Sequence, residues 1–163
     1  MPHRGYRPGT TVLSQTWTKH DNAKLQKIRE LTFAFAIPHG YTCEELAQGT
    51  VACGHGFTSK SAYVYIQPST CGCTLAQVTK IVDNDLSSKQ AYRRLLPVDP
   101  FTRVSDYGNG KAKYQYWMSR VYGTHRGRID HHVLVYGQAN NHTDAVKIRK
   151  IIGDIYDATR QHS

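Results

Sequence analysis

The chain has 163 residues, which suits one domain that buries a hydrophobic core of its own. Lysine and arginine total 21 against 12 for aspartate and glutamate, and the resulting formal charge of +9 favours salt-sensitive binding to polyanions. No apolar run reaches the roughly 18 residues needed to span a bilayer, so no membrane span is expected. Charge alone does not choose between RNA, DNA, a membrane surface and an acidic protein.

In chain order, residues 1–20 are polar and hold two prolines and two glycines, which is typical of a flexible N-terminal arm. Residues 21–163 are expected to form a single α+β domain. Leu25, Ile28 and Leu31 recur at helical spacing, which predicts a helix from about residue 21 to residue 35, ended by Pro38. The run 44–48 could form one helical turn.

The middle of the chain predicts a strand and two helical segments. Residues 62–67 alternate in polarity as a strand does and end before Pro68. Residues 75–83 and 87–96 have helical apolar spacing, and Pro97 ends the second of them. A turn over 106–110 then leads to the most distinctive part of the chain.

Residues 113–137 predict a central β-hairpin. In Tyr114–Tyr122, alternation places Tyr114, Tyr116, Met118, Arg120 and Tyr122 on one face, and Gln115, Trp117, Ser119 and Val121 on the other. Because both faces are partly apolar, this strand is expected to be central in its sheet. Residues 132–136 form the second strand, and the loop between them is rich in arginine and histidine.

The segment 143–161 predicts a C-terminal amphipathic helix with Thr143 as its N-cap. A strand over 145–152 is the competing interpretation, because these residues are rich in β-branched side chains. The predicted fold class is therefore α+β, with helices packed on a small antiparallel β-sheet that contains the central hairpin, plus the C-terminal helix.

The chain has four cysteines, Cys43, Cys53, Cys71 and Cys73. We expect two disulfides in which Cys71 and Cys73 each reach back to Cys43 or Cys53, since a bond between Cys71 and Cys73 would be strained. Disulfides imply an oxidising compartment and a secreted chain; free thiols in a cytoplasmic protein are the alternative. A structural zinc held by these cysteines with His39 or His55 is a further alternative, although the ligand spacing is unusual.

The hairpin loop predicts a nucleic-acid-binding site, because cationic side chains bind phosphates and aromatic rings stack on unpaired bases. The residues expected to take part are Arg120, Tyr122, His125, Arg126, Arg128 and His132. The opposing interpretation is that the aromatic residues fill the core while the charges are merely solvated.

Catalysis is the other possibility for this loop. RNA cleavage needs a base, an acid and cations around the phosphate. His125, His131 and His132 are the residues that could supply the acid and base, but His131 and His132 would point to opposite faces of a strand. The chain has no P-loop, nucleophile elbow or dinucleotide fingerprint, so no cofactor is expected. No metal is expected either, because disulfides are favoured over the zinc alternative. We therefore expect a binding protein, with an active endoribonuclease as the alternative.

Several short motifs resemble small secreted fungal ribonucleases of the guanyl-specific type and the ribonuclease-like effectors of plant-infecting fungi. They are Tyr41-Thr-Cys43, Cys53-Gly-His-Gly-Phe57, Tyr114-Gln-Tyr-Trp117 and His132-Val-Leu-Val-Tyr136. Where those enzymes carry a glutamate base this chain has Tyr116, where they carry a strand arginine it has His131 or His132, and their final histidine has no match. The resemblance thus implies a non-catalytic member, secreted as a virulence effector, that binds RNA or a host protein. A zinc-stabilised interaction protein remains an alternative.

Overall fold

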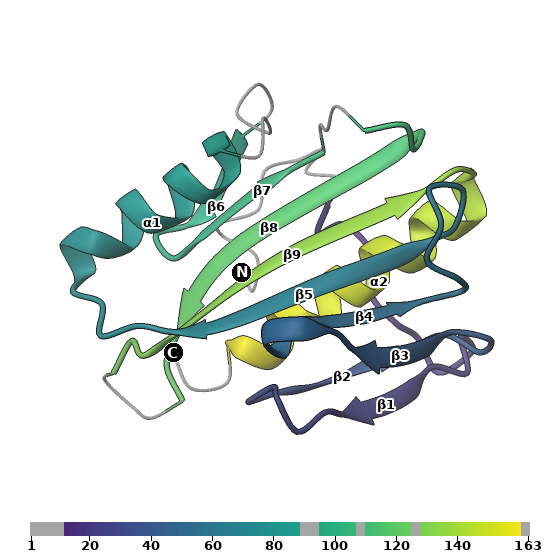
Figure 1. Cartoon of the computed structure of the whole chain (residues 1–163), viewed down its shortest axis with the longest axis horizontal. Coiled ribbons are helices and arrows are strands. Elements are labelled where there is room, and N and C mark those ends of the chain that lie inside the picture. The colour runs from purple at the N-terminus through teal and green to yellow at the C-terminus, as the bar shows by residue number, and fades with distance from the viewer. Residues whose placement is uncertain (1–11, 89–94, 107–109, 125–127, 161–163) are drawn as a thin grey trace.

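The structure is a computed structural model that describes residues 12–88, 95–106, 110–124 and 128–160. It is mostly β, with a seven-stranded antiparallel sheet, a separate two-stranded sheet and two α-helices (Figure 1). The predicted α+β class, with helices packed on a small sheet, is therefore wrong. The two helices pack against the seven-stranded sheet, whose strands hold more residues than both helices together.

The seven strands follow the order β3-β4-β5-β9-β8-β7-β6 across the sheet. Their bounds are β3 Thr42–Glu45, β4 Val51–Gly54, β5 Tyr63–Thr70, β6 Leu95–Asp99, β7 Thr102–Ser105, β8 Tyr114–Tyr122 and β9 His131–Ala139. The long strands β8 and β9 pair along their whole length, from Tyr114 opposite Ala139 to Tyr122 opposite His131. The predicted hairpin therefore exists and occupies the middle of the sheet.

The expected helix over residues 21–35 is absent. Strand β1, Lys24–Lys27, pairs instead with strand β2, Ala34–Ile37, in the two-stranded sheet. Alternate residues of β2 are buried, Phe35 at 0% and Ile37 at 3% exposure, which is the period of a strand. Two long-range hydrogen bonds hold this strand: the indole of Trp17 donates to the Ala36 carbonyl at 3.1 Å, and the Ala36 amide donates to Asp154 at 2.6 Å.

Helix α2, His142–Thr159, covers one face of the large sheet, where Figure 1 shows it behind β5 and β9. Its apolar side is fully buried through Ile148, Ile151, Ile152 and Ile155. The Asn141 side chain caps the helix by accepting from the Asp144 amide at 2.8 Å. The C-terminal segment is thus a helix and not the strand considered as its alternative.

Helix α1, Leu75–Ser88, packs by Val78 and Val82 on Val121, near one end of β8. It takes the place of the first predicted helical segment. Part of the second, over 87–96, falls on β6, and residues 89–94 lie outside the described residues. Residues 47–49 form a 3-10 turn after β3, where a helical turn over 44–48 was expected.

Within the predicted N-terminal arm, residues 1–11 lie outside the described residues. Val12 and Leu13, which follow them, are 0% and 2% exposed and belong to the main core. Lys150 of α2 forms an ion pair of 3.0 Å with Asp21. From Val12 onward the chain is therefore packed against the domain.

All four cysteines form disulfides, Cys43 with Cys53 and Cys71 with Cys73. The prediction of disulfides is confirmed. The predicted pairing, in which Cys71 and Cys73 each bond to Cys43 or Cys53, is wrong. Cys43 and Cys53 face each other across the β3–β4 pair, so this bond is local to a hairpin.

No helix of the described chain has the length and apolar character that crossing a bilayer requires.

Candidate binding surface

The two faces of β8 have different environments because α2 covers only one of them. Tyr116, Met118, Arg120 and Tyr122 lie on the covered face and are at most 4% exposed. Gln115, Trp117, Ser119 and Val121 alternate with them on the opposite face. The alternation predicted from the sequence is confirmed by the register of β8 with β9.

Arg120 cannot be a nucleic-acid contact, because its side chain is 1% exposed inside the domain. Its guanidinium donates to Thr159 Oγ1 and Thr102 Oγ1, each at 2.7 Å, and lies 4.9 Å from the centre of the Tyr156 ring. Asp99 is 3.7 Å away and is also bound by the Tyr156 hydroxyl at 2.6 Å. Arg120 therefore ties β8, β7 and the end of α2 together.

Tyr122 is also withdrawn from solvent on the covered side, at 4% exposure. Its hydroxyl is 2.6 Å from Thr32 Oγ1, and its ring contacts Phe33 edge-on at 6.0 Å. Stacking of Tyr122 on a base, as the sequence suggested, is therefore wrong. Of the loop residues predicted to bind, Arg128 is exposed, whereas His125 and Arg126 lie outside the described residues.

The opposite face of the sheet carries a row of aromatic rings across β5, β9 and β8. We call this surface the aromatic floor; it consists of Tyr63, Tyr65, Gln67, Leu134, Tyr136 and Trp117. Trp117 and Tyr136 are direct cross-strand partners whose ring centres are 4.6 Å apart, and Tyr65 is the partner of Tyr136 on its other side. Tyr63 and Tyr65 continue the row at 4.7 Å.

A hollow of about 130 Å³ lies on this floor, lined by Tyr65, Gln67, Trp117, Leu134 and Tyr136. The lining includes no aspartate, glutamate, lysine, arginine or histidine. Burial raises the pKa of Tyr136 far above its usual value. The indole Nε1 of Trp117 is buried and has no hydrogen-bond partner in the described chain. Flat rings beside an exposed amide, Gln67, suit a planar ligand that has its own polar edge.

Lysines flank the floor at the end where β8 begins and β9 ends. Gln138 donates to the carbonyls of Ser59 and Ser61 at 3.2 and 3.0 Å, which holds the loop carrying the exposed Lys60. Gln115 donates to the carbonyls of Gly110 and Ala112 at 3.1 and 2.9 Å, which holds the segment carrying the exposed Lys111. The two segments that carry these lysines are thus held at one end of the floor.

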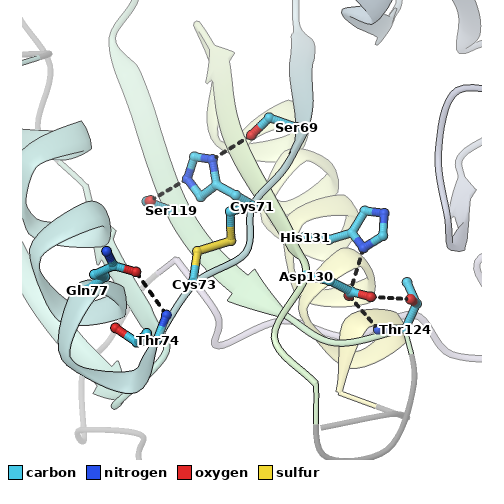
Figure 2. Close-up of a disulfide and its surroundings, with 10 residues drawn as sticks. Ser69, Cys71, Cys73, Thr74, Gln77, Ser119, Thr124, Asp130 and His131 are labelled. Atoms are coloured by element: carbon cyan, nitrogen blue, oxygen red, sulfur yellow. Dashed lines mark hydrogen bonds and ion pairs between the residues drawn. A yellow bond between two sulfur atoms is a disulfide. The ribbon is translucent and has the colours of Figure 1, made fainter.

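His132 lies on the floor side, and His131 on the covered side, as the alternation predicted. The imidazole of His132 bridges two hydroxyls, with Nδ1 at 3.1 Å from Ser69 and Nε2 at 3.1 Å from Ser119 (Figure 2). Ser119 is fully buried. Both ring nitrogens of His132 are thus engaged within the protein, which leaves this histidine poorly placed for catalysis.

His131 has the geometry of an oriented base. Its Nδ1 is 2.9 Å from Asp130 Oδ1, and Thr124 donates to both oxygens of that carboxylate at 3.0 Å through its amide and its hydroxyl (Figure 2). The hydrogen bond from His131, followed by the one from the Thr124 amide, holds the pKa of Asp130 far below its usual value. An ionised Asp130 fixes the proton on Nδ1, so Nε2 of His131 is the basic nitrogen.

His131 lines a second hollow, of about 270 Å³, together with Glu30, Thr32, Gly49, Pro68, Ser69, Thr70 and Tyr122. Glu30 and Glu45 interact: their contact lowers the pKa of Glu30 and raises the pKa of Glu45, as when two carboxyls share one proton. Glu30 could not be identified from the sequence, because the pattern of residues 21–35 predicts a helix with no link to the hairpin. Aromatic floor and His131 hollow lie on opposite faces of the sheet.

The zinc alternative is not supported, because all four cysteines are consumed in disulfides. In the described ranges no group of three or more histidines, cysteines, aspartates and glutamates comes together that could hold a metal ion. The sequence did not identify Tyr63, Tyr65, Gln67 and Leu134 as site residues. Trp117 and Tyr136 belong to the predicted aromatic hairpin, but they were not among the predicted contact residues. A signal existed, since Tyr63 and Tyr65 alternate, but nothing in the sequence tells which face a helix leaves open.

Comparison with known proteins adds little. No protein family matches the sequence, and no curated protein is similar to it. A crystal structure at 1.50 Å resolution of a protein from Bacteroides thetaiotaomicron aligns with 12% identity and a TM-score of 0.45, over 80% of this chain and 47% of that one. The chain thus spans about half the length of that protein. The ribonuclease resemblance stays a prediction.

Proposed function

We propose that the protein is a binding module for single-stranded nucleic acid, RNA in particular, and that the aromatic floor is its binding surface. The observation that carries the proposal is the row of half-buried rings of Tyr65, Tyr136 and Trp117, which line a hollow on the sheet face that neither described helix covers at that place. Unpaired bases stack on aromatic side chains presented by a sheet, and this stacking tolerates any base. The proposed binding site is thus the sheet face, and not the hairpin loop that the sequence predicts.

Charge supports a polyanion over a neutral ring-bearing ligand such as a sugar. The exposed Lys60 and Lys111 belong to segments held at one end of the floor, and the whole chain carries a net charge of +9. These lysines supply the salt-dependent attraction for phosphates, while the uncharged rings receive the bases. The Gln67 amide can pair with the edge of a stacked base.

A titration with a single-stranded RNA oligonucleotide, followed by tryptophan fluorescence at 50 and 200 mM salt, tests this function. Two phosphate contacts on a single strand predict that affinity falls roughly sevenfold across this range. Duplex RNA of the same sequence should bind more weakly, because its bases are not free to stack. No binding at low salt, affinity that ignores salt, or preference for a neutral oligosaccharide would each contradict it.

An active endoribonuclease is the second candidate function, favoured by the Asp130–His131 pair in its hollow. His131 Nε2 would be the base that removes the proton from a 2′-hydroxyl. Cleavage that is lost in His131→Ala and kept in His132→Ala would establish it. We rank it second because no arginine or lysine lines the described part of this hollow to stabilise the phosphorane.

Secretion and a role directed at host RNA or a host protein, which the effector resemblance implies, belong to the same proposal. The two disulfides support an oxidising compartment. Finding the native chain with both disulfides in the medium of its source organism would support secretion; finding it in the cytoplasm with free thiols would oppose it.

A further inference from the structure

The disulfide between Cys71 and Cys73 lies at a junction of the fold. It follows the end of β5 and directly precedes α1, whose first turn is marked by hydrogen bonds between Thr74 and Gln77 (Figure 2). The two cysteines are half-buried and pack against the small apolar cluster under α1. A Cβ at Gly72, the residue between them, would meet nothing within 4 Å. The bond is therefore half-buried, and the residue between its two cysteines is exposed to solvent.

The second disulfide provides a contrast within the same chain. Cys53 is 0% exposed in the main core, and its bond to Cys43 joins paired positions of β3 and β4. That bond closes a loop with a sequence separation of 10, whereas Cys71 and Cys73 are separated by 2. Because the stabilisation from closing a loop grows with loop length, the Cys71–Cys73 bond contributes less to the fold.

We propose that Cys71–Cys73 is a redox-active disulfide that exchanges with thiols, whereas Cys43–Cys53 is structural. Disulfides that solvent partly reaches and that stabilise the fold little are more reactive toward external thiols than disulfides buried in the core. The start of α1 adds a chemical reason, since the N-terminal end of a helix favours a thiolate. The substrate class is a low-molecular-weight thiol such as glutathione, or a cysteine of a partner protein.

The exchange proceeds in two balanced steps. A substrate thiolate attacks Sγ of Cys71, which forms a mixed disulfide, and the bond to Cys73 breaks so that Cys73 leaves as a thiolate beside the first turn of α1. A second substrate thiolate attacks the substrate sulfur of the mixed disulfide and releases Cys71. The two protons lost by the substrate thiols return to Cys71 and Cys73, and one substrate disulfide is formed while the protein disulfide is reduced.

The test equilibrates the full native chain in glutathione buffers of graded ratio of reduced to oxidised form, then quenches, alkylates and digests it. Trypsin cleavage after Lys60 places the two cysteine pairs on separate peptides, so mass spectrometry reports each pair. We expect Cys71–Cys73 to be reduced, and so alkylated, at a ratio of reduced to oxidised glutathione about tenfold or more lower than the ratio that reduces Cys43–Cys53. Joint reduction of both pairs, or earlier reduction of Cys43–Cys53, would overturn the proposal.

Circular dichroism of the same samples separates a redox site from a structural bond. The proposal expects the spectrum to stay unchanged while only Cys71–Cys73 is reduced, and a loss of structure at that stage would overturn it. The double variant Cys71→Ser/Cys73→Ser should fold and consume no glutathione. In the single variants, the Cys73 thiol left by Cys71→Ser should alkylate at lower pH than the Cys71 thiol left by Cys73→Ser; the reverse order would refute Cys73 as the leaving group.

Discussion

His131 and His132 are consecutive residues of β9, yet their rings lie on opposite faces of the seven-stranded sheet and have different partners. His131 is held by an ionised Asp130, while His132 bridges the hydroxyls of Ser69 and Ser119. The two imidazoles therefore cannot work on one phosphate. The face with the aromatic floor carries aromatic rings, but its histidine, His132, is hydrogen-bonded within the protein. On the other face His131 is oriented by Asp130, but no cation lines the described part of its hollow.

Replacing Arg120 with Met should lower the free energy of unfolding by about 2–4 kcal/mol, because Asp99 and two threonines lose their buried partner. Denaturant unfolding measures this change. Arg128→Met, at an exposed position, serves as the matched control and should change stability by less than about 0.5 kcal/mol. A folded Arg120→Met protein that has lost RNA affinity but no stability would contradict the structural role assigned to Arg120.

Gly137→Ala should destabilise the domain by about 1–3 kcal/mol through overpacking between β9 and α2. A Cβ at this position would lie 2.5 Å from Cγ2 of Ile148, which is itself fully buried. Gly72→Ala adds the same methyl group where nothing lies within 4 Å and should be neutral. Thermal unfolding of the two variants checks the contrast, and equal midpoints would show that α2 does not pack closely on β9.

Asp130→Asn should weaken the acid sensitivity of the fold. The pKa of Asp130 is lower in the folded protein than its ordinary 3.8, chiefly through the hydrogen bond from His131. This carboxylate therefore stabilises the fold above about pH 4, and its contribution is lost as the pH falls toward the folded-state pKa. The difference in melting temperature between wild type and variant should shrink below pH 4. A constant difference down to pH 2 would contradict the Asp130–His131 hydrogen bond.

The sequence could predict the elements whose signal is strong and local. The β8–β9 hairpin and α2 follow from alternation and helical spacing within one segment. The expected helix over 21–35 failed because long-range contacts decide there: Trp17 and Asp154 bind the backbone of Ala36 from distant parts of the chain. The alternation of Phe33, Phe35 and Ile37 is typical of a strand. The spacing of Leu25, Ile28 and Leu31 is typical of a helix, and the prediction followed this second pattern.

The candidate site was partly predictable. Alternation separated Trp117 from Arg120 and Tyr122 correctly, but the choice of face depends on where α2 docks, which no local pattern encodes. The predicted binding residues Arg120 and Tyr122 lie on the face that α2 covers, and the rings of the floor on the other face come from three strands. Likewise, the disulfide pairing depends on the β3–β4 hairpin, whose short strands carry little sequence signal.

The most direct test of the binding surface is the affinity of Trp117→Ala for single-stranded RNA, compared with that of Tyr114→Ala. Both residues are aromatic and lie on β8, but on opposite faces. Loss of one stacked base predicts a decrease of about 1–3 kcal/mol in binding free energy for Trp117→Ala, while Tyr114→Ala should bind like wild type. A folded Trp117→Ala protein that binds RNA as tightly as wild type would contradict the aromatic floor as the nucleic-acid site.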